Sequence, residues 1–352
     1  MLGWLSDHQI VALVGVFGGV LLGLAARLGR FCTMGAIEDM LYGGSDLRMR
    51  MWALAIGTAV TGSFALIGAG LLDPGQTFYL SIRWMPLASI LGGLMFGYGM
   101  ALAGNCGYGA IARLGGGDLR SFVIVLVMGV STYIVLSGPL APLRNFFFEQ
   151  VDVTTEIPPG LAHHAAALTG WPLAPIGIGV GLLICGAALA APALRQDLKS
   201  VLWSLAVGVA IVSGWAGTQW VNANGFEALP VVSHSFSAPV GETILWTMTG
   251  SLRPVSFAVG SVAGIWLGAF IGSLIKGHFR WEACEDPREL RRQIVGAAIM
   301  GAGAVIAMGC TVGQGMTAFS LLAISAPVTF LAIFAGAALG LRQLIEGFRP
   351  AE

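Results

Sequence analysis

Long apolar stretches separated by short polar segments run along almost the whole chain. A helix that crosses a membrane needs about 20 mostly apolar residues. Stretches of that size occur near 10–28, 51–72, 84–103, 119–139, 173–193, 200–221, 253–275, 289–308 and 318–342. The pattern predicts an all-α polytopic membrane protein with about nine transmembrane helices. We expect the first stretch to be a retained helix, because Met1 to Gln9 lacks the basic residues that open a cleaved signal.

The basic residues predict an orientation for these helices. Cytoplasmic loops of membrane proteins carry an excess of Lys and Arg. If the N-terminus lies outside, 15 of the 18 Lys and Arg residues fall inside, and only Arg83, Arg144 and Arg253 fall outside. We therefore expect a bacterial inner-membrane protein with a periplasmic N-terminus and a cytoplasmic C-terminus. The two long outer loops, 140–172 and 222–252, are expected to be periplasmic caps without a core of their own.

The chain also resembles itself at two spacings. A shift of 151 residues places Trp52 on Trp203, and we expect both to anchor at the membrane interface. A shift of 204 residues matches the two sets Gly92, Gly97, Gly99, Ala103, Cys106, Gly109 and Gly296, Gly301, Gly303, Ala307, Cys310, Gly313.

These matches predict two transmembrane pseudo-repeats, 1–139 and 173–352, joined by the periplasmic loop 140–172. The second repeat would hold one extra span near 253–275. Repeated halves usually place a substrate path at their shared interface. The predicted topology makes the 84–103 and 289–308 spans antiparallel and the 51–72 and 200–221 spans parallel. A single uniform inverted repeat does not produce both relations.

Composition narrows the class of protein further. Hydrophobic residues make up 56% and charged residues 10% of the chain, against about 25% charged in a typical soluble domain. The net charge of zero gives no electrostatic basis for a nucleic-acid partner. Five cysteines without a CxxC pair argue against a zinc ribbon or a disulfide scaffold, and all five histidines fall outside the predicted spans. We expect no metal and no cofactor.

Three Gly–Cys turns, each at the end of an apolar stretch, carry the candidate chemistry. They occupy residues 27–35, 103–118 and 308–315. Clustered glycine interrupts a helix, and freed backbone groups at membrane depth are tolerated where they line a cavity or are packed in protein. If a short re-entrant helix restarts there, its N-terminal amides favour an anion.

A cysteine in each turn adds a weak S–H donor and a soft, polarizable sulfur. These properties suit a ligand with a terminal sulfur better than sulfate or phosphate. A transport role would use neutral thiols, whereas a redox role would need thiolates. A single membrane cysteine is usually a small packing residue, and we interpret Cys185 as packing and Cys284 as incidental.

At these turns the chain resembles the YeeE/YedE family of membrane transporters for sulfur compounds, which includes thiosulfate importers. The resemblance rests on Arg27 to Cys32, Cys106 to Gly117 and Gly309 to Gly315. It implies a narrow pore in which three cysteines pass thiosulfate inward by successive S–H hydrogen bonds. On the predicted topology Cys310 lies nearest the outside, Cys106 deeper and Cys32 nearest the cytoplasm. The family also implies a small cytoplasmic sulfur-carrier protein as a partner.

The candidate substrate-binding residues come from the three turns and their flanking arginines. They are Cys32, Cys106, Cys310, Gly104, Asn105, Gly107, Gly309, Thr311, Gly313, Gln314, Arg30 and Arg113. Gln314 and Thr311 either bind the ion or satisfy local backbone groups. Arg27, Arg30 and Arg113 either attract an anion to the inner mouth or reflect the ordinary inside bias. Asn105 stands where the family has glycine, so the transported ion could differ from thiosulfate.

Import of thiosulfate or a related small sulfur anion across the lipid bilayer is the leading hypothesis. A selenium compound or another sulfur compound is an alternative substrate. A membrane enzyme that handles persulfides is a second alternative, but it needs a resolving cysteine and an activating base, and the sequence offers neither. A structural scaffold would leave the three turns unexplained. We place no carboxylate in the middle of a span, which argues against an ion-coupling site.

Overall fold

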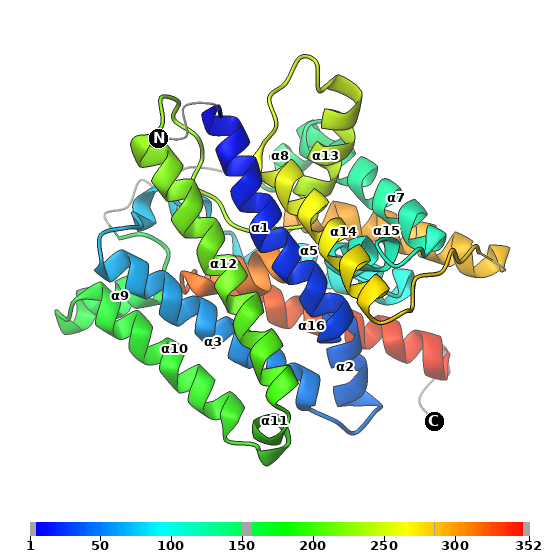
Figure 1. Cartoon of the computed structure of the whole chain (residues 1–352), viewed down its shortest axis with the longest axis horizontal. Coiled ribbons are helices and arrows are strands. Elements are labelled where there is room, and N and C mark those ends of the chain that lie inside the picture. Colours follow the sequence, from blue (N-terminus) through cyan, green and yellow to red (C-terminus); the bar gives the residue numbers. More distant parts are fainter. Residues whose placement is uncertain (1–4, 150–156, 285, 348–352) are drawn as a thin grey trace.

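The computed structural model describes residues 5–149, 157–284 and 286–347 (Figure 1). The described residues contain helices and no β-strand. The elements are α1 (Asp7–Leu28), α2 (Thr33–Leu41), α3 (Leu47–Gly68), η1 (Pro74–Gln76), α4 (Phe78–Ser81), α5 (Pro86–Ala103), α6 (Gly107–Leu114), α7 (Leu119–Leu136), α8 (Ala141–Phe147), α9 (Leu161–Thr169), α10 (Leu173–Leu189), α11 (Pro192–Gln196), α12 (Leu198–Asn224), α13 (Ala238–Thr249), α14 (Phe257–Ile275), α15 (Pro287–Ile306), the π-helix η2 (Gly313–Ala318) and α16 (Ser325–Glu346).

The predicted all-α membrane architecture is confirmed. Among the described residues, seven helical stretches are long and apolar enough to cross a membrane, and each overlaps a predicted span. They are Asp7–Leu41, Leu47–Gly68, Pro86–Leu114, Leu119–Leu136, Leu198–Asn224, Phe257–Ile275 and Ser325–Glu346. The two remaining predicted spans overlap α10, which has 17 residues, and α15, which begins with a charged turn. The count of nine crossings stays a prediction.

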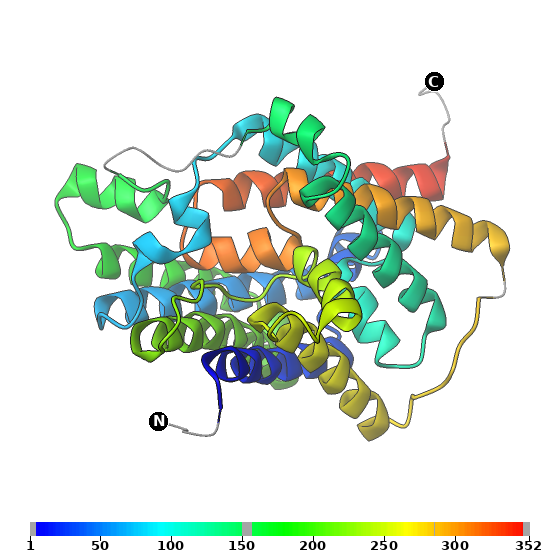
Figure 2. The same ribbon diagram turned by 90° about the horizontal axis from the view of Figure 1, so that it is seen from above.

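Helices α12, α1 and α14 lie side by side (Figure 1) and form one layer when the molecule is seen from above (Figure 2). Glycines make the contact between α1 and α14 close. A methyl group on Gly19 or Gly23 would overlap backbone atoms of α14, and one on Gly264 or Gly268 would overlap backbone atoms of α1. Such small residues let membrane helices approach closely enough for dispersion contacts to hold them together.

The pair α5 and α15 uses glycine in the same way, but the chains run in opposite directions. A methyl group on Gly99 would lie 2.5 Å from the Gly296 carbonyl oxygen, and one on Gly303 would lie 2.5 Å from the Phe96 nitrogen. The residue numbers fall along one helix as they rise along the other, so α5 and α15 are antiparallel. Helix α5 also packs on α16, where a methyl group on Gly97 would overlap the Ile333 carbonyl.

The close contacts of α3 define one more relative direction. A methyl group on Gly208 would lie 2.6 Å from Thr58 Cβ, and one on Gly62 would lie 2.5 Å from Val212 Cγ2, so α3 and α12 are parallel. The antiparallel pair α5 and α15 and the parallel pair α3 and α12 both agree with the topology predicted from the sequence. The helix predicted as an extra span, α14, packs mainly on α1. The division into repeats 1–139 and 173–352 stays a prediction.

Two expectations about polar and aromatic segments are wrong. Trp52 is 1% exposed and stacks between Phe31 and Phe330, with ring centroids 5.0 and 5.7 Å away. It therefore packs in the core and does not anchor at a membrane interface. Its position near the start of a span suggested an interface, but this face of α3 is covered by other protein segments.

The loop 222–252 is also more than a cap. It contains α13, and the segment before α13 enters the helix bundle, where His234 and Phe236 are both fully buried. The Phe236 ring lies 5.8 Å from that of Tyr108 in α6. The other outer loop, 140–172, contains the short helices α8 and α9, and its residues 150–156 lie outside the described part of the chain.

Candidate functional site

Each of the three Gly–Cys turns ends one helix and begins a shorter helical segment. Cys32 is the N-cap residue of α2 and Cys106 is the N-cap residue of α6. Cys310 precedes the helical residues 311–320, which include η2. The first N–H groups of a helix have no partner within that helix, and its N-terminal end is partially positive. Each thiol therefore lies beside groups that favour negative charge.

The backbone turns in the same way at all three places. The residue two positions before each cysteine has a left-handed conformation, with φ of 54° at Arg30, 77° at Gly104 and 55° at Met308. This conformation costs an L-residue other than glycine roughly 1–2 kcal/mol. Only the central turn has glycine at that position. The shared conformation was therefore not visible in the sequence, although all three turns share the spacing Cys-x-x-Gly.

Backbone amides donate to two of the three sulfur atoms. The Gly109 N–H donates to Cys106 Sγ and the Gly313 N–H to Cys310 Sγ, each at 3.4 Å. The Phe236 N–H, from the segment that enters the bundle, also donates to Cys310 Sγ at 3.3 Å. Because these sulfur atoms accept the N–H groups, their own S–H protons remain able to donate elsewhere.

Cys106 occupies the middle of the arrangement. It is fully buried, and both Cys32 and Cys310 lie near enough for a charge on either to act on it. The Thr311 hydroxyl faces the Cys106 thiol and is buried without a well-formed hydrogen bond. Cys310 is 1% exposed, whereas Cys32 is partly exposed. The three thiols thus form a series with its buried members at Cys106 and Cys310.

A cavity of about 490 Å³, cavity A, lies at the end of the bundle where α1 begins. His8 and Val11 of α1 line it, as do Met308 and Gly309 immediately before Cys310. Most of its lining is apolar, and its polar groups include several hydroxyls. Ser237 Oγ is buried at this cavity, with no hydrogen-bond partner among the described residues.

A second cavity of about 360 Å³, cavity B, lies at the end where α1 terminates. Cys32, Gly104 and Asn105 line it. Its charged lining is strongly basic, with five cationic side chains against the single carboxylate of Glu38. The cationic residues are Arg27, Arg30, Arg48, Arg113 and Lys276. Cavities A and B therefore lie at opposite ends of α1, with Cys310 beside one and Cys32 beside the other.

The twelve predicted site residues fall into three groups in the structure. Five line cavity B, one lines cavity A, and six are buried and line neither cavity. The residues that line cavity B are Cys32, Gly104, Asn105, Arg30 and Arg113. The residue that lines cavity A is Gly309. The buried residues are Cys106, Cys310, Gly107, Thr311, Gly313 and Gln314.

Gln314 and Asn105 use their amides differently. Gln314 Nε2 donates to the Ala307 and Met308 carbonyls at 3.0 and 3.2 Å, and its Oε1 accepts from Ser325 at 3.2 Å. Gln314 therefore satisfies the backbone of its own turn. Asn105 is 2% exposed and lines cavity B, and its side chain makes no hydrogen bond among the described residues. Its amide is therefore available to a molecule in that cavity.

Two residues near Cys310 were not predicted from the sequence. Ser235 Oγ lies 3.8 Å from Cys310 Sγ. The Tyr79 side chain lies beside Ser235 and against the Gly309 and Gly313 backbone. Both come from connecting segments far from Cys310 in the sequence. A parallel bridge between Thr77 and Val231 joins these segments, but no sequence pattern indicated it.

Comparison with known proteins places this geometry in a family. The family model described as Sulphur transport matches residues 28–339. The thiosulfate transporter TsuA of Escherichia coli is 27% identical over 328 residues, covering 88% of this chain and 88% of the relative. TsuA of Spirochaeta thermophila is 24% identical over 322 residues, covering 88% and 92%. The probable transporter YedE of Salmonella typhimurium is 23% identical over 164 residues, covering 45% and 39%.

The family match includes all three Gly–Cys turns except Arg27, the first residue of the first turn. It also includes the residues that line cavity B, apart from Ala26 and Arg27. The resemblance inferred from the turns is therefore confirmed, and the chain belongs to the YeeE/YedE family of sulphur transporters.

Proposed function

We propose that this chain imports thiosulfate, or a closely related small sulfur-containing anion, along a path from cavity A past Cys310, Cys106 and Cys32 to cavity B. One observation carries the proposal. Cys106 is fully buried and lies near both Cys32, which lines cavity B, and Cys310, whose two preceding residues line cavity A. Both curated TsuA relatives, which this chain matches over most of its length, are named thiosulfate transporters.

The chemistry of the path suits a soft anion. Burying a charge costs free energy unless hydrogen bonds replace its water. Thiols and backbone amides are neutral donors, so they can solvate an anion without holding it as tightly as an arginine would. A terminal sulfur is polarizable and matches the soft sulfur of a thiol. An anion that presents a sulfur end should therefore pass more readily than sulfate.

The charge difference between the cavities supports inward movement. Among the described residues, the lining of cavity A includes the carboxylate of Glu242 and no Lys or Arg, whereas cavity B has five Lys and Arg side chains. We propose that cavity A opens to the periplasm and cavity B to the cytoplasm, with a periplasmic N-terminus and a cytoplasmic C-terminus in the inner membrane. A small cytoplasmic sulfur-carrier protein would then receive the anion at the basic mouth.

Growth of a bacterial host that lacks its own thiosulfate and sulfate uptake tests the proposal. The wild-type chain should restore growth on thiosulfate as the sole sulfur source, whereas Cys106→Ala and Cys310→Ala should not. Cys185→Ala is the matched control. Its Sγ packs against Leu54 in α3, away from both cavities, so growth should persist.

Membrane levels of each variant must be equal for this comparison. Growth of the Cys106→Ala and Cys310→Ala hosts at the wild-type rate would refute the thiol path. Restored growth on sulfate but not on thiosulfate would refute the proposal that thiosulfate is the transported anion. Uptake of selenite in place of thiosulfate would favour the alternative of a selenium substrate.

A further inference from the structure

A third cavity, chamber C, lies beside cavity B and has a volume of about 450 Å³. Its lining includes the Gly116 and Gly277 backbones and two carboxylates, Asp118 and Glu282. Arg27, Arg113 and His278 line both chamber C and cavity B. Cys32, Gly104 and Asn105 line only cavity B, so chamber C is a side compartment and not part of the thiol path.

The strap that follows α14, residues 276–284, borders chamber C. Backbone hydrogen bonds hold it to the glycine run that follows α6. The Arg280 N–H donates to Gly116 O at 3.3 Å, and the Glu282 N–H donates to Gly117 O at 3.0 Å. Gly117 has φ of 97°, and a methyl group there would overlap the Arg280 carbonyl. The chamber therefore has a defined backbone frame.

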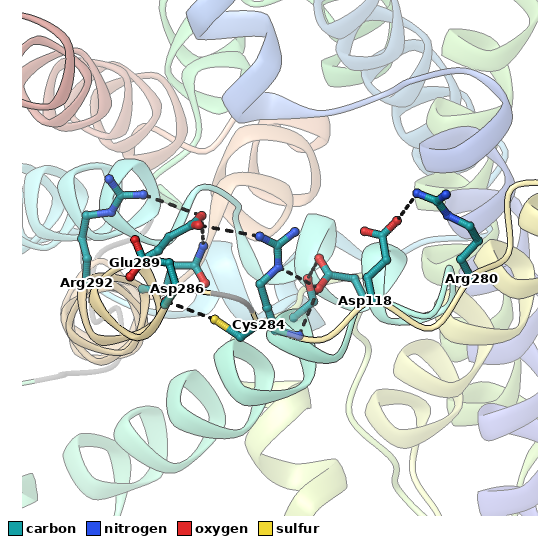
Figure 3. Close-up of polar contacts among 10 residues, drawn as sticks. Asp118, Arg280, Cys284, Asp286, Glu289 and Arg292 are labelled. Carbon is teal, nitrogen blue, oxygen red and sulfur yellow. Dashed lines mark hydrogen bonds and ion pairs between the residues drawn. The ribbon is translucent and has the colours of Figure 1, made fainter.

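Side-chain ion pairs neutralise part of the chamber, and Figure 3 shows this network. Arg280 Nη2 lies 3.0 Å from Glu282 Oε1, and Arg120 Nε lies 3.3 Å from Asp118 Oδ1. Arg120 also approaches Glu289 at 3.8 Å. Both carboxylates of the chamber are thus paired with the arginines next to them.

The other two arginines of the chamber have no such partner. Within the described residues neither Arg27 nor Arg113 forms an ion pair. Arg27 and Arg113 lie close enough for their charges to repel each other, and the charges of Glu282 and Asp118, which lie beyond ion-pair distance, offset part of this repulsion at Arg27. Two adjacent unpaired guanidinium groups beside a cavity favour an anion between them, because it removes the repulsion and accepts their N–H groups.

The position of Arg27 is fixed by its surroundings. Its Nε donates to Ser273 Oγ at 2.6 Å, and its other nitrogens lie where a side chain on Gly116 would be. Because Gly116 has no side chain, the guanidinium can lie against the backbone of the glycine run. Such preorganisation reduces the entropy that binding a ligand would otherwise cost.

We propose that chamber C is a binding site for a divalent tetrahedral oxyanion, such as sulfate or hydrogen phosphate, held by Arg27 and Arg113. With two carboxylates offsetting two of the four arginines, the formal excess in the chamber is two positive charges, which matches a dianion. Because the same arginines line cavity B, an occupant of chamber C would compete with a transported anion for their charge. Only this last consequence rests on the proposed function.

Binding of radiolabelled sulfate to the full-length protein in phosphatidylcholine nanodiscs tests the site, at an ionic strength of about 0.15 M so that charges outside the chamber are screened. We expect saturable binding that phosphate displaces. Arg113→Gln, at an exposed side chain, should weaken sulfate binding at least about tenfold, since a hydrogen bond to a charged group contributes roughly 1.5–3 kcal/mol. Glu282→Gln removes a negative charge from chamber C and should tighten binding.

Two variants confined to cavity B serve as matched controls. Arg30→Gln and Glu38→Gln change charges that line cavity B but not chamber C, so sulfate affinity should stay within about twofold. The absence of saturable sulfate binding would overturn the proposal. A sulfate affinity that changes on substitution of Arg30 or Glu38, but not of Arg113 or Glu282, would also overturn it.

Nanodiscs with phosphatidylglycerol separate two sources of the same chemistry. Equal sulfate affinity in both lipids supports a free oxyanion, whereas loss of sulfate binding only with phosphatidylglycerol supports a lipid phosphate in the same arginine site. Neither of these two binding measurements reports on transport. A chain that binds sulfate in this way but imports no thiosulfate would refute the proposed function and leave the site intact.

Discussion

The left-handed residue two positions before each thiol is the local feature that joins the three turns. At Arg30 and Met308 a side chain occupies a conformation that glycine adopts without strain. Strained backbone persists where the surrounding structure holds it, and it is often found at functional sites. We interpret the strain here as the cost of presenting a cysteine at the start of a helix.

Substitution of Met308 tests whether this conformation is required. Met308→Val should lower the Tm and the uptake rate, because a β-branched residue is especially disfavoured at φ of 55°. Met308→Gly should keep or raise the Tm, since glycine adopts this φ freely. Differential scanning fluorimetry of the purified variants measures the effect, with Met308→Leu as the control for lost thioether contacts. Equal Tm values for the Val and Gly variants would show that the conformation is not required.

Sequence reasoning located the three thiols because glycine and cysteine recur together at the ends of apolar stretches. It could not decide the role of Gln314, since only the fold shows that its amide is used by the Ala307 and Met308 carbonyls. It missed Tyr79 and Ser235 entirely. Those residues reach Cys310 through tertiary contacts between two connecting segments, and neither segment has a periodic pattern.

Glycine determines how closely the long helices pack. In membranes, where lipid is as apolar as leucine, close backbone approach replaces hydrophobic burial as the main source of helix association. The contacts of α1 with α14 and of α5 with α15 and α16 depend on positions where any side chain would overlap a neighbouring backbone. These helix pairs hold the turns in place, because α1, α5 and α15 each lead directly into one of the thiols.

Gly97→Ala should destabilise the protein by about 1–3 kcal/mol, because the added methyl group overlaps the Ile333 carbonyl and forces α5 and α16 apart. The matched control is Gly179→Ala in α10. A methyl group there meets no atom within 4 Å, so the Tm should stay equal or rise slightly. Thermal unfolding of both variants in the same detergent measures the difference. A Gly97→Ala protein as stable as the control would contradict the close packing of α5 and α16.

Hydropathy predicted the long helices well because every backbone group in lipid must be paired within its own segment. It was less informative about segments whose neighbours are protein. Trp52 and the segment that carries His234 and Phe236 were assigned to polar surroundings from their place in the sequence, yet all three residues are buried. A hydropathy window contains only local sequence, so it does not detect burial against a distant part of the same chain.

Taken as a whole, the molecule has an apolar cavity at one end of α1 and two basic compartments, cavity B and chamber C, at the other. This asymmetry agrees with the excess of basic residues that orientation rules place in the cytoplasm. On the proposed path, an anion that reaches Cys32 would meet the positive field of cavity B.

A natural cysteine in the strap provides a test of this orientation. Cys284 is partly exposed, so a membrane-impermeant maleimide should label it in inside-out vesicles but not in intact cells with a permeable outer membrane. Cys284→Ser should remove the label and serve as the specificity control. Labelling of Cys284 in intact cells would place the strap and chamber C outside and reverse the predicted topology.

The rate of thiosulfate entry into proteoliposomes tests the thiol path most directly, because the purified chain acts there without other cell components. Vesicles with the wild-type protein should accumulate ³⁵S-labelled thiosulfate well above empty vesicles. Cys106→Ala, which removes the central buried thiol, should reduce the initial rate at least about tenfold, since a charge in transit would lose a hydrogen bond that contributes roughly 1.5–3 kcal/mol. A Cys106→Ala protein that folds normally and transports at the wild-type rate would contradict the account.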